Sequence, residues 1–259
     1  MNIIVCVKQV PVTNQVKMDN KNHTMQRENI DSRTNAFDLN AIEEALRIKE
    51  QMGGTVTVLC MGVLSVEKKL KELYALGVDE VILLSDRKFA GADSLATAYT
   101  LSKGIEKISD YDLILCGLQS TDGDTGQVGP SVAAKLDIPH ITCVVNIETI
   151  ENESILCKRL VEGGHEYVQI KLPGLITVTN EINEPRKPLI KDILKARSKS
   201  VKIWDCDAVN ADSNACGLKG SPTRVTRTFK VGSTKEVKFI EGDKNKKAEA
   251  LLRILSEVK

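Results

Sequence analysis

The sequence predicts an α/β fold: a doubly wound, mostly parallel sheet with antiparallel additions and a long C-terminal arm. Two observations carry this prediction. Continuous aliphatic runs alternate with amphipathic helical periods over the first half of the chain, a pattern typical of parallel sheets with right-handed crossovers. After Pro139 the helical periods stop, and short strand-like runs follow one another up to residue 179.

Four aliphatic runs in the first half are expected to be strands covered on both faces, because they lack polar alternation. They are residues 3–7, 56–60, 81–84 and 113–116. Apolar residues at helical spacing predict helices between these strands, around residues 41–48, 70–76 and 95–101. The polar segment 12–30 interrupts this rhythm and is expected to be a hairpin inserted after the first strand.

The second half has a different organisation. Short antiparallel strands are expected at residues 141–150, 155–161, 167–170 and 175–179. Past Asn183 prolines and charges become frequent, one amphipathic stretch covers residues 189–197, and a final helix is expected over residues 244–258. We therefore expect an α/β body at residues 1–182 and an arm at residues 183–259.

The composition argues against several classes of protein. Lys and Arg number 36 against 35 Asp and Glu, a net charge of +1, whereas a nucleic-acid-binding chain is normally strongly basic. Aromatic residues make up 3% of the chain, too few for a base-stacking platform. No apolar run approaches the ~18 residues of a membrane span. We therefore expect neither nucleic-acid binding nor membrane insertion.

The cysteines and histidines point to a reduced protein without a metal site. The seven cysteines are an odd number and include no CxxC pair, which argues against a disulfide framework and favours a cytoplasmic location. The three histidines are scattered along the chain and suggest no zinc site. No metal is therefore expected.

The charge is distributed unevenly. Residues 183–259 carry 18 Lys and Arg against 10 Asp and Glu, a balance of +8, while residues 1–182 carry 18 against 25, a balance of −7. This asymmetry predicts that the arm docks on an acidic surface, either a partner or the body of the chain itself. The aromatic residues of the arm, Trp204, Phe229 and Phe239, are expected to anchor it against a partner subunit.

A glycine-rich turn after residues 113–116 is the candidate binding site. It runs GLQSTDGDTGQVGP over residues 117–130 and leads into a helical period. Ligands of open parallel sheets bind at the carboxyl ends of strands. Glycines allow the backbone to approach a ligand, and a helix start directs N–H groups toward an anion. The turn therefore predicts a phosphate or pyrophosphate cradle, although its spacing is neither GxGxxG nor a Walker loop. A tight turn without a ligand is the alternative.

Polar residues near this edge are expected to cap helices. Asp122 and Asp124 would repel a phosphate that they faced, so we expect them to cap the following helix or to bind ribose or a cation. Asp93 or Ser94 is the expected N-cap of the helix around residues 95–101, and Asn35 and Asp38 are expected caps of the first helix.

The sequence offers no catalytic group. No nucleophile, base and orienting residue stand together at a fixed spacing. A carrier, or a protein whose cofactor performs the chemistry, fits this pattern.

Several stretches together resemble the small (beta) subunit of the electron-transfer flavoproteins, in order and spacing, over nearly the whole chain. They are VCVKQVP at 5–11, AIEEA at 41–45, AGADS at 90–94, DGDTGQVGP at 122–130, KRLVEGGHEYV at 158–168, LPGLIT at 172–177 and NEPR at 183–186. The resemblance implies the fold of the adenine-nucleotide alpha hydrolases. It also implies a heterodimer with a larger alpha subunit that carries FAD, and an adenine nucleotide bound by the body, residues 1–182.

Carried over by position, the resemblance implies cofactor contacts from four parts of the chain. They are Cys6; Asn35, Ala36, Phe37 and Asp38; Met61; and the run Asp122, Gly123, Asp124, Thr125, Gly126, Gln127, Val128, Gly129, Pro130, Ser131, Val132 and Ala133. The form of residues 122–130 is more similar to the electron-bifurcating type, in which the nucleotide is a second FAD. In that scheme NADH reduces this FAD, and one electron passes to ferredoxin. The other passes through the alpha-subunit FAD to a dehydrogenase of the acyl-CoA or 2-hydroxy acid (lactate) type.

The amphipathic stretch of the arm resembles the family's recognition loop, whose apolar tip enters a pocket on the dehydrogenase. Ile190 occupies the tip position, beside Leu189, Ile193 and Leu194. The lysines around them would steer docking toward an acidic partner. The alternative is an ordinary helix with a core face and a cationic last turn.

Two other functions remain open. The chain could be a non-bifurcating electron-carrier subunit that holds AMP in place of the second FAD. It could also be a stand-alone ATP-binding module of the universal-stress type, which shares the fold and would not need residues 183–259. Both as a bifurcating subunit and as an AMP-holding carrier, the chain would act as an electron-carrying subunit of an oxidoreductase complex.

Overall fold

The computed structural model describes residues 1–12, 31–151, 153–226 and 239–257, so the hairpin expected at residues 12–30 lies almost entirely outside the described residues. The chain forms two units, Met1–Thr226 and Arg227–Lys259. The expected division into a nucleotide-binding body and a partner-binding arm at residue 183 concerns function and stays a prediction. The compact units themselves divide after Thr226.

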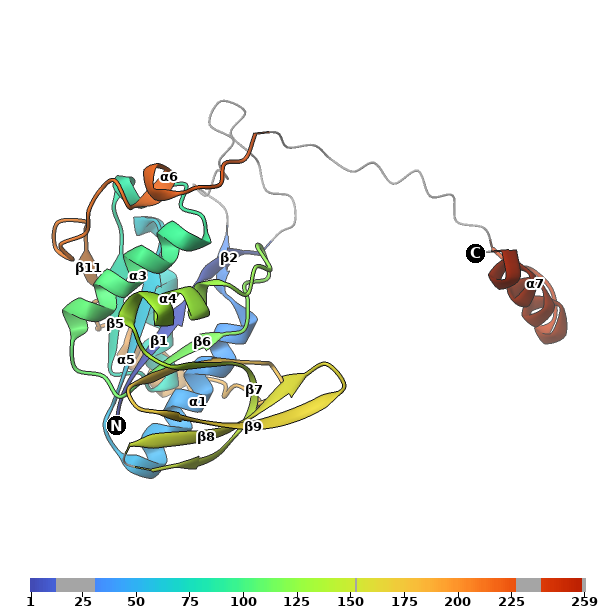
Figure 1. Ribbon diagram of the computed structural model, residues 1–259, viewed down its shortest axis with the longest axis horizontal. Coiled ribbons are helices and arrows are strands. Elements are labelled where there is room, and N and C mark those ends of the chain that lie inside the picture. Colours follow the sequence, from blue (N-terminus) through green and yellow to red (C-terminus); the bar gives the residue numbers. More distant parts are fainter. Residues whose placement is uncertain (13–30, 152, 227–238, 258–259) are drawn as a thin grey trace. The chain divides into compact units, whose positions relative to one another are not determined.

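Within the described residues, one nine-stranded sheet has the order β11-β5-β4-β1-β6-β10-β7-β8-β9 (Figure 1). Its strands are β1 (Asn2–Val7), β4 (Thr55–Met61), β5 (Glu80–Leu84), β6 (Leu113–Gly117), β7 (His140–Ile150), β8 (Ser154–Val161), β9 (Gly164–Lys171), β10 (Gly174–Val178) and β11 (Lys202–Trp204). The four aliphatic runs of the first half form β1, β4, β5 and β6, which pair in parallel. Burial on both faces explains why these runs show no polar alternation.

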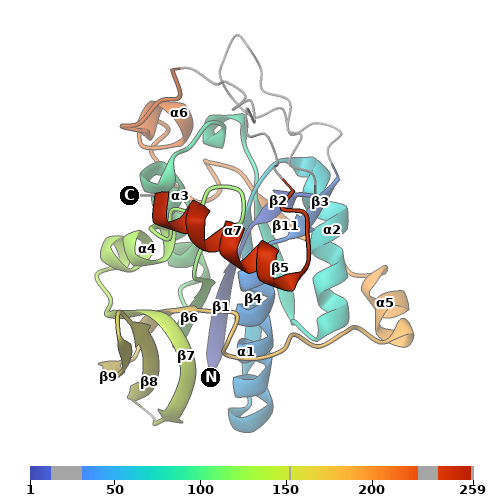
Figure 2. The ribbon, with the colours of Figure 1, turned by 90° about the vertical axis from the view of Figure 1, so that its right-hand side faces the viewer.

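Helices cover both faces of the sheet (Figure 2). They are α1 (Ala36–Met52), α2 (Glu67–Lys71), α3 (Ser94–Ile108), α4 (Val128–Leu136), α5 (Ile190–Ala196) and α6 (Gly217–Gly220), with 3-10 turns η1 (Leu64–Val66), η2 (Glu72–Leu76) and η3 (Arg87–Phe89). One apolar cluster joins α1 and α2 to the sheet, and a second joins α3 and α4 to its other face. The doubly wound, mostly parallel α/β fold predicted from the sequence is therefore confirmed.

The direction of one strand differs from the prediction. Residues 175–179 were expected to be antiparallel, but β10 pairs in parallel with β6 on one side and with β7 on the other. The antiparallel part of the sheet consists of β7, β8 and β9. All five residues of β10 are buried, as expected of a strand with covered faces, and burial does not reveal direction.

The C-terminal residues of the first unit also join its core. β11 pairs in parallel with β5 and forms one edge of the sheet, and Trp204 packs against the cluster on the α3 side. The Lys107 ammonium lies 5.0 Å from the centre of the Trp204 ring. The prediction that Trp204 anchors an arm to a partner subunit is therefore wrong, whereas Phe229 lies outside the described residues.

The second unit contains helix α7 (Lys244–Glu257), close to the helix expected at residues 244–258. Its apolar residues Leu251, Leu252, Ile254 and Leu255 are all exposed. Phe239, which precedes the helix, is 85% exposed. An amphipathic helix with an exposed apolar face is a typical surface for packing against another element.

Candidate functional site

The strand order reverses at β1, which makes its carboxyl end the candidate site. From β1 the chain adds β4 and β5 on one side and then returns to add β6 on the other. Cys6 of β1 lies opposite Cys116 of β6 near this end. Open α/β sheets bind ligands in the crevice at such a switch point. Met61 ends the neighbouring strand β4 at the same edge.

The two thiols at this point are buried and contact each other. A hydrogen bond with Cys6, together with burial, raises the pKa of Cys116 well above its ordinary value. All seven cysteines lie within the described residues and are thiols. Cys116 is therefore held as a neutral thiol, and the two small, buried side chains suit packing rather than nucleophilic chemistry.

Asn35 tethers the start of α1 to the glycine-rich turn. Its amide nitrogen donates to Gln119 O at 2.8 Å and to Asp38 Oδ1 at 3.0 Å, and its Oδ1 accepts the Thr121 N–H at 3.2 Å. Asn35 occupies the N-cap position of α1 but makes no capping bond with its side chain. Asn35 therefore has the predicted position, but the prediction that its side chain caps α1 is wrong, because that side chain binds the turn that follows β6.

Asp38 joins the same network from the first turn of α1. Its Oδ2 accepts the Lys8 N–H at 2.7 Å, and it also accepts a backbone N–H from Gly117. The expected capping role is wrong here too, since these bonds link α1 to the ends of β1 and β6. Burial raises the pKa of Asp38 from 3.8 to about 7, and its hydrogen bonds only partly oppose that shift.

Lys8 was not predicted as a site residue. Its ammonium donates to Asp122 Oδ1 at 2.6 Å and to Ser120 Oγ at 3.2 Å, so it ties the end of β1 to the turn. Capping of α4 was one of the roles predicted for Asp122, and the structure does not show it, because Asp122 pairs with Lys8 and α4 has no side-chain cap. Lys8 directly follows β1, and the glycine-rich turn directly follows β6, so both lie at the carboxyl ends of neighbouring parallel strands. This position in the sequence could have identified Lys8 as a site residue.

The turn ends in a helix whose start lacks a side-chain cap. Gln127 is the N-cap of α4 and makes no capping bond. Gly126, just before it, has φ +61°, a conformation that favours glycine, and a Cβ there would come 3.7 Å from Leu118 O. In the first turn of α4, a Cβ on Gly129 would come 2.6 Å from Thr177 Cγ2. The helix start is therefore held close to β10 and has no side-chain cap on its N–H groups, which suits an anion.

The predicted contact residues gather at this edge, but with different exposure. Ala36, Gly123, Asp124, Thr125 and Gln127 are exposed, while Phe37, Met61, Asp122, Gly126, Val128, Pro130 and Ser131 are half-buried. Val132 and Ala133 are buried in the core cluster on the α3 side. Asp124 has φ +48° and accepts a hydrogen bond from Gln119 at 3.2 Å.

The predicted partner-binding residues lie elsewhere, on α5. Ile190 is 79% exposed, and Leu189, Ile193 and Leu194 are exposed as well. Ala196 is the buried residue of this short helix. The alternative of an ordinary helix with a core face fails for these four side chains within the structure of this chain.

The described residues contain no group of three or more His, Cys, Asp or Glu side chains that could hold a metal ion. Likewise, none of the helices among them is both long and apolar enough to cross a membrane.

Comparison with known proteins gives a family. The electron transfer flavoprotein domain matches residues 23–209. An electron transfer flavoprotein subunit beta from Thermoanaerobacterium thermosaccharolyticum is 50% identical over 88% of this chain and 87% of its own. One from Clostridium acetobutylicum is 44% identical over 92% and 90%. The caffeyl-CoA reductase-Etf complex subunit CarD of Acetobacterium woodii is 44% identical over 88% and 87%.

The family match covers most of the chain, and these relatives are similar over nearly their whole lengths. The chain therefore belongs to the beta-subunit family of the electron transfer flavoproteins.

Proposed function

We propose that this chain binds FAD at the edge formed by β1, β6 and α4, as the beta subunit of an electron-bifurcating flavoprotein. NADH is the electron donor. Electrons leave in two directions, to ferredoxin and, through an FAD of the alpha subunit, to a flavin dehydrogenase. FAD supplies one- and two-electron redox chemistry when bound, and the residues of this chain bind and orient it.

The uncapped start of α4 at the switch point is the observation that carries the proposal. A pyrophosphate needs backbone N–H groups and a backbone that it can approach closely. The glycine-rich turn offers both, and its first half is fixed by the Lys8–Asp122 ion pair and by the bonds of Asn35 to Gln119 and Thr121. The acidic carboxylate nearest the strand ends, Asp38, is held largely protonated below about pH 7, which lessens its repulsion of a phosphate.

The sequence of the glycine-rich turn is our ground for preferring the second FAD to AMP. The form of residues 122–130 supports the bifurcating type, and CarD is named as a subunit of a reductase-Etf complex. A protein named FixA from Azotobacter vinelandii, 41% identical, is similar as well. Membership of the family also favours either electron-transfer function over a stand-alone ATP-binding module.

Two exposed apolar surfaces support the proposed partners. The apolar face of α7, which includes Leu252 and Leu255, is suited to packing on the alpha subunit. The α5 surface, formed by Leu189, Ile190, Ile193 and Leu194, is suited to a pocket on the dehydrogenase. Lys191 and Lys195 on α5 are exposed around it, and this positive charge would steer docking to an acidic rim.

Nucleotide content tests the cofactor. The chain is purified with its alpha subunit and denatured, and the released nucleotides are separated and counted. Two FAD per heterodimer is the expected result. One FAD with one AMP would refute the bifurcating assignment and leave the electron-carrier alternative.

A matched pair of glycine variants tests the location. Gly126→Val should release the nucleotide of this chain, because a branched side chain stands where the phosphates need to approach the backbone. Gly163→Val is the control, since Gly163 also has a positive φ, of +85°, but lies in the β8–β9 turn with no atom within 4 Å of its Cβ position. Full nucleotide content in Gly126→Val, or equal losses in both variants, would count against the cradle.

A further inference from the structure

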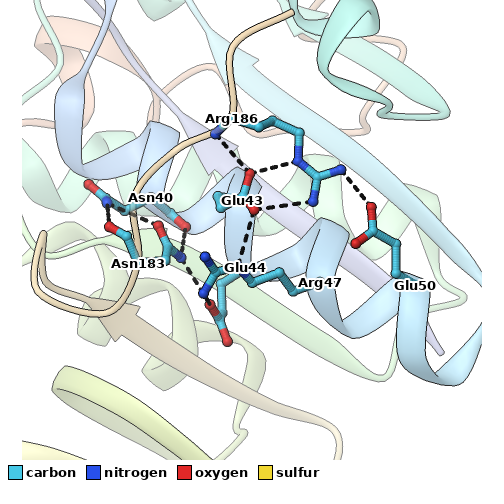
Figure 3. Close-up of polar contacts among 7 residues, drawn as sticks. All are labelled: Asn40, Glu43, Glu44, Arg47, Glu50, Asn183 and Arg186. Atoms are coloured by element: carbon cyan, nitrogen blue, oxygen red, sulfur yellow. Dashed lines mark hydrogen bonds and ion pairs between the residues drawn. The ribbon is translucent and has the colours of Figure 1, made fainter.

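The chain segment that leads to α5 is fixed to the middle of α1 (Figure 3). Asn183 and Asn40 exchange hydrogen bonds: the Asn40 amide donates to Asn183 O at 2.8 Å, and the Asn183 amide donates to Asn40 O at 3.0 Å. The Asn183 amide also donates to Glu44 Oε2 at 2.9 Å. This exchange holds the segment at Asn183, five residues after the end of β10.

Arg186 makes the stronger attachment three residues later. Its backbone N–H and its Nε both donate to Glu43 Oε2, at 3.0 and 2.7 Å, and its Nη2 donates to Glu43 Oε1 at 3.1 Å. Its Nη1 donates to Glu50 Oε1 at 2.6 Å. One guanidinium therefore binds carboxylates from two turns of α1, and a bidentate pair of this kind fixes orientation as well as distance (Figure 3).

The burial of Glu43 makes this pair more than a surface ion pair. The Glu43 side chain is 6% exposed, against 32% for Arg186. Burial opposes ionisation of Glu43, but the hydrogen bonds and charge of Arg186 together outweigh it and lower the Glu43 pKa. Exposed ion pairs contribute little because solvent screens them, whereas a buried carboxylate depends on its partner.

The far side of α5 is attached to a different part of the sheet edge. The Tyr74 hydroxyl donates to Ser200 O at 2.8 Å, Lys202 pairs with Glu80, and β11 follows directly. Residues 187–195 thus lie between two attachments, α5 itself packs against η2, and the apolar side chains of Leu189, Ile190 and Leu194 stay exposed. The direction in which these side chains are presented depends on both attachments together with this packing.

We propose that Arg186 is a positioning residue for partner docking: by binding Glu43 and Glu50 it fixes the N-terminal root of residues 187–195 and so the direction in which Ile190 is presented. The inference rests on the proposed docking function of the α5 surface. Arg186 itself lies outside that surface, and its effect acts through the orientation of the segment.

The test uses the chain in complex with its alpha subunit, in four variants. Arg186→Gln removes the guanidinium, and Arg186→Lys keeps the charge without the bidentate geometry. Arg47→Gln is the matched control, because Arg47 also donates to Glu43 Oε1, at 3.1 Å, but from α1 itself and without touching the segment. Ile190→Asp tests the docking surface directly.

Two measurements separate the possibilities. Amide hydrogen exchange of residues 187–195 reports the attachment without any docking partner. The KM and kcat for electron delivery to a purified acyl-CoA dehydrogenase report docking. In Arg186→Gln we expect faster exchange and a KM raised about tenfold, the result of a docking-competent population reduced to about a tenth. The kcat at saturating dehydrogenase should be unchanged, Arg186→Lys should be intermediate, and Arg47→Gln should match the wild type.

The outcomes that overturn the proposals differ. A KM that rises in Ile190→Asp but not in Arg186→Gln would overturn the positioning role of Arg186 alone. Unchanged KM in both variants would overturn the docking function of the α5 surface, and the positioning role with it. Equal changes in Arg186→Gln and Arg47→Gln would show that loss of a Glu43 partner, rather than the attachment of the segment, is responsible, and would overturn the positioning role.

Discussion

Replacing Asp38 by asparagine should remove a pH dependence from the stability of this protein. The Asp38 carboxyl is 6% exposed, and burial raises its pKa from 3.8 to about 7 although three N–H groups oppose the shift. Between about pH 4 and pH 7 the folded chain holds a proton there that the unfolded chain has released. The free energy of unfolding therefore falls as pH rises through this window.

The size of the effect follows from the same values. One proton contributes about 1.4 kcal/mol per pH unit within the window, so this group lowers the free energy of unfolding by about 2 kcal/mol between about pH 5.5 and pH 7. Asparagine has one acceptor oxygen where Asp38 uses two, so the variant also carries a loss that does not depend on pH. The slope against pH, and not the offset, is the diagnostic quantity.

Urea unfolding of the wild type and of Asp38→Asn, each as the complex with its alpha subunit, measures that slope. As pH rises toward 7, the free energy of unfolding of the wild type should fall relative to that of Asp38→Asn. Above pH 7 the difference between the two should level off. A carbon-13 titration of the aspartate carboxyls provides a direct check, with one signal that has a midpoint near 7 and is missing in the variant. Parallel pH profiles, or no such signal, would refute the reasoning.

Three further variants have defined outcomes. A Cβ on Gly117 would overlap Asp38 Oδ1 and lie 2.7 Å from the Phe37 backbone. For about 2 kcal/mol of overpacking, calorimetry of Gly117→Ala should show a Tm about 6 °C lower than that of the wild type. Gly164→Ala is the control and should leave Tm unchanged, because no atom lies within 4 Å of its Cβ position. Ile190→Asp should weaken electron delivery to the dehydrogenase while NADH-dependent flavin reduction stays intact; equal loss of both would contradict the separation of docking from the flavin site. A Leu252→Asp/Leu255→Asp double variant should lose co-purification with a tagged alpha subunit, and retained pairing would contradict the role given to α7.

The sequence predicted the strands that can be recognised from a few consecutive apolar residues. It did not predict pairings between residues that are far apart in the chain. Strands β1, β4, β5 and β6 are continuous aliphatic runs because helices cover both their faces, and that property is visible in a few residues. The direction of β10 depends instead on where the β8–β9 hairpin returns the chain. No periodicity within residues 175–179 contains that information.

The site shows the same division. The glycine-rich turn was found because glycines and a strand-to-helix change stand side by side in the sequence. Asn35 and Asp38 were given capping roles because capping is the usual local use of such residues before a helix. Their true partners, Gln119, Thr121 and Lys8, lie on other elements. Asp93, whose partners are local, does cap α3 through Leu95 and Ala96 as predicted.

The central position of β1 also sets an order of events during synthesis. Ile3 pairs with Val56 on one side but with Leu113 on the other, so the first strand to leave the ribosome waits for β6 before its second edge is covered. The turn that follows β6 is in turn fixed to β10, where Leu118 donates to Val178 O at 2.9 Å. A nascent chain therefore completes the contacts of the glycine-rich turn only after residue 178 has emerged, and the proposed binding of a nucleotide there belongs to a late stage of folding.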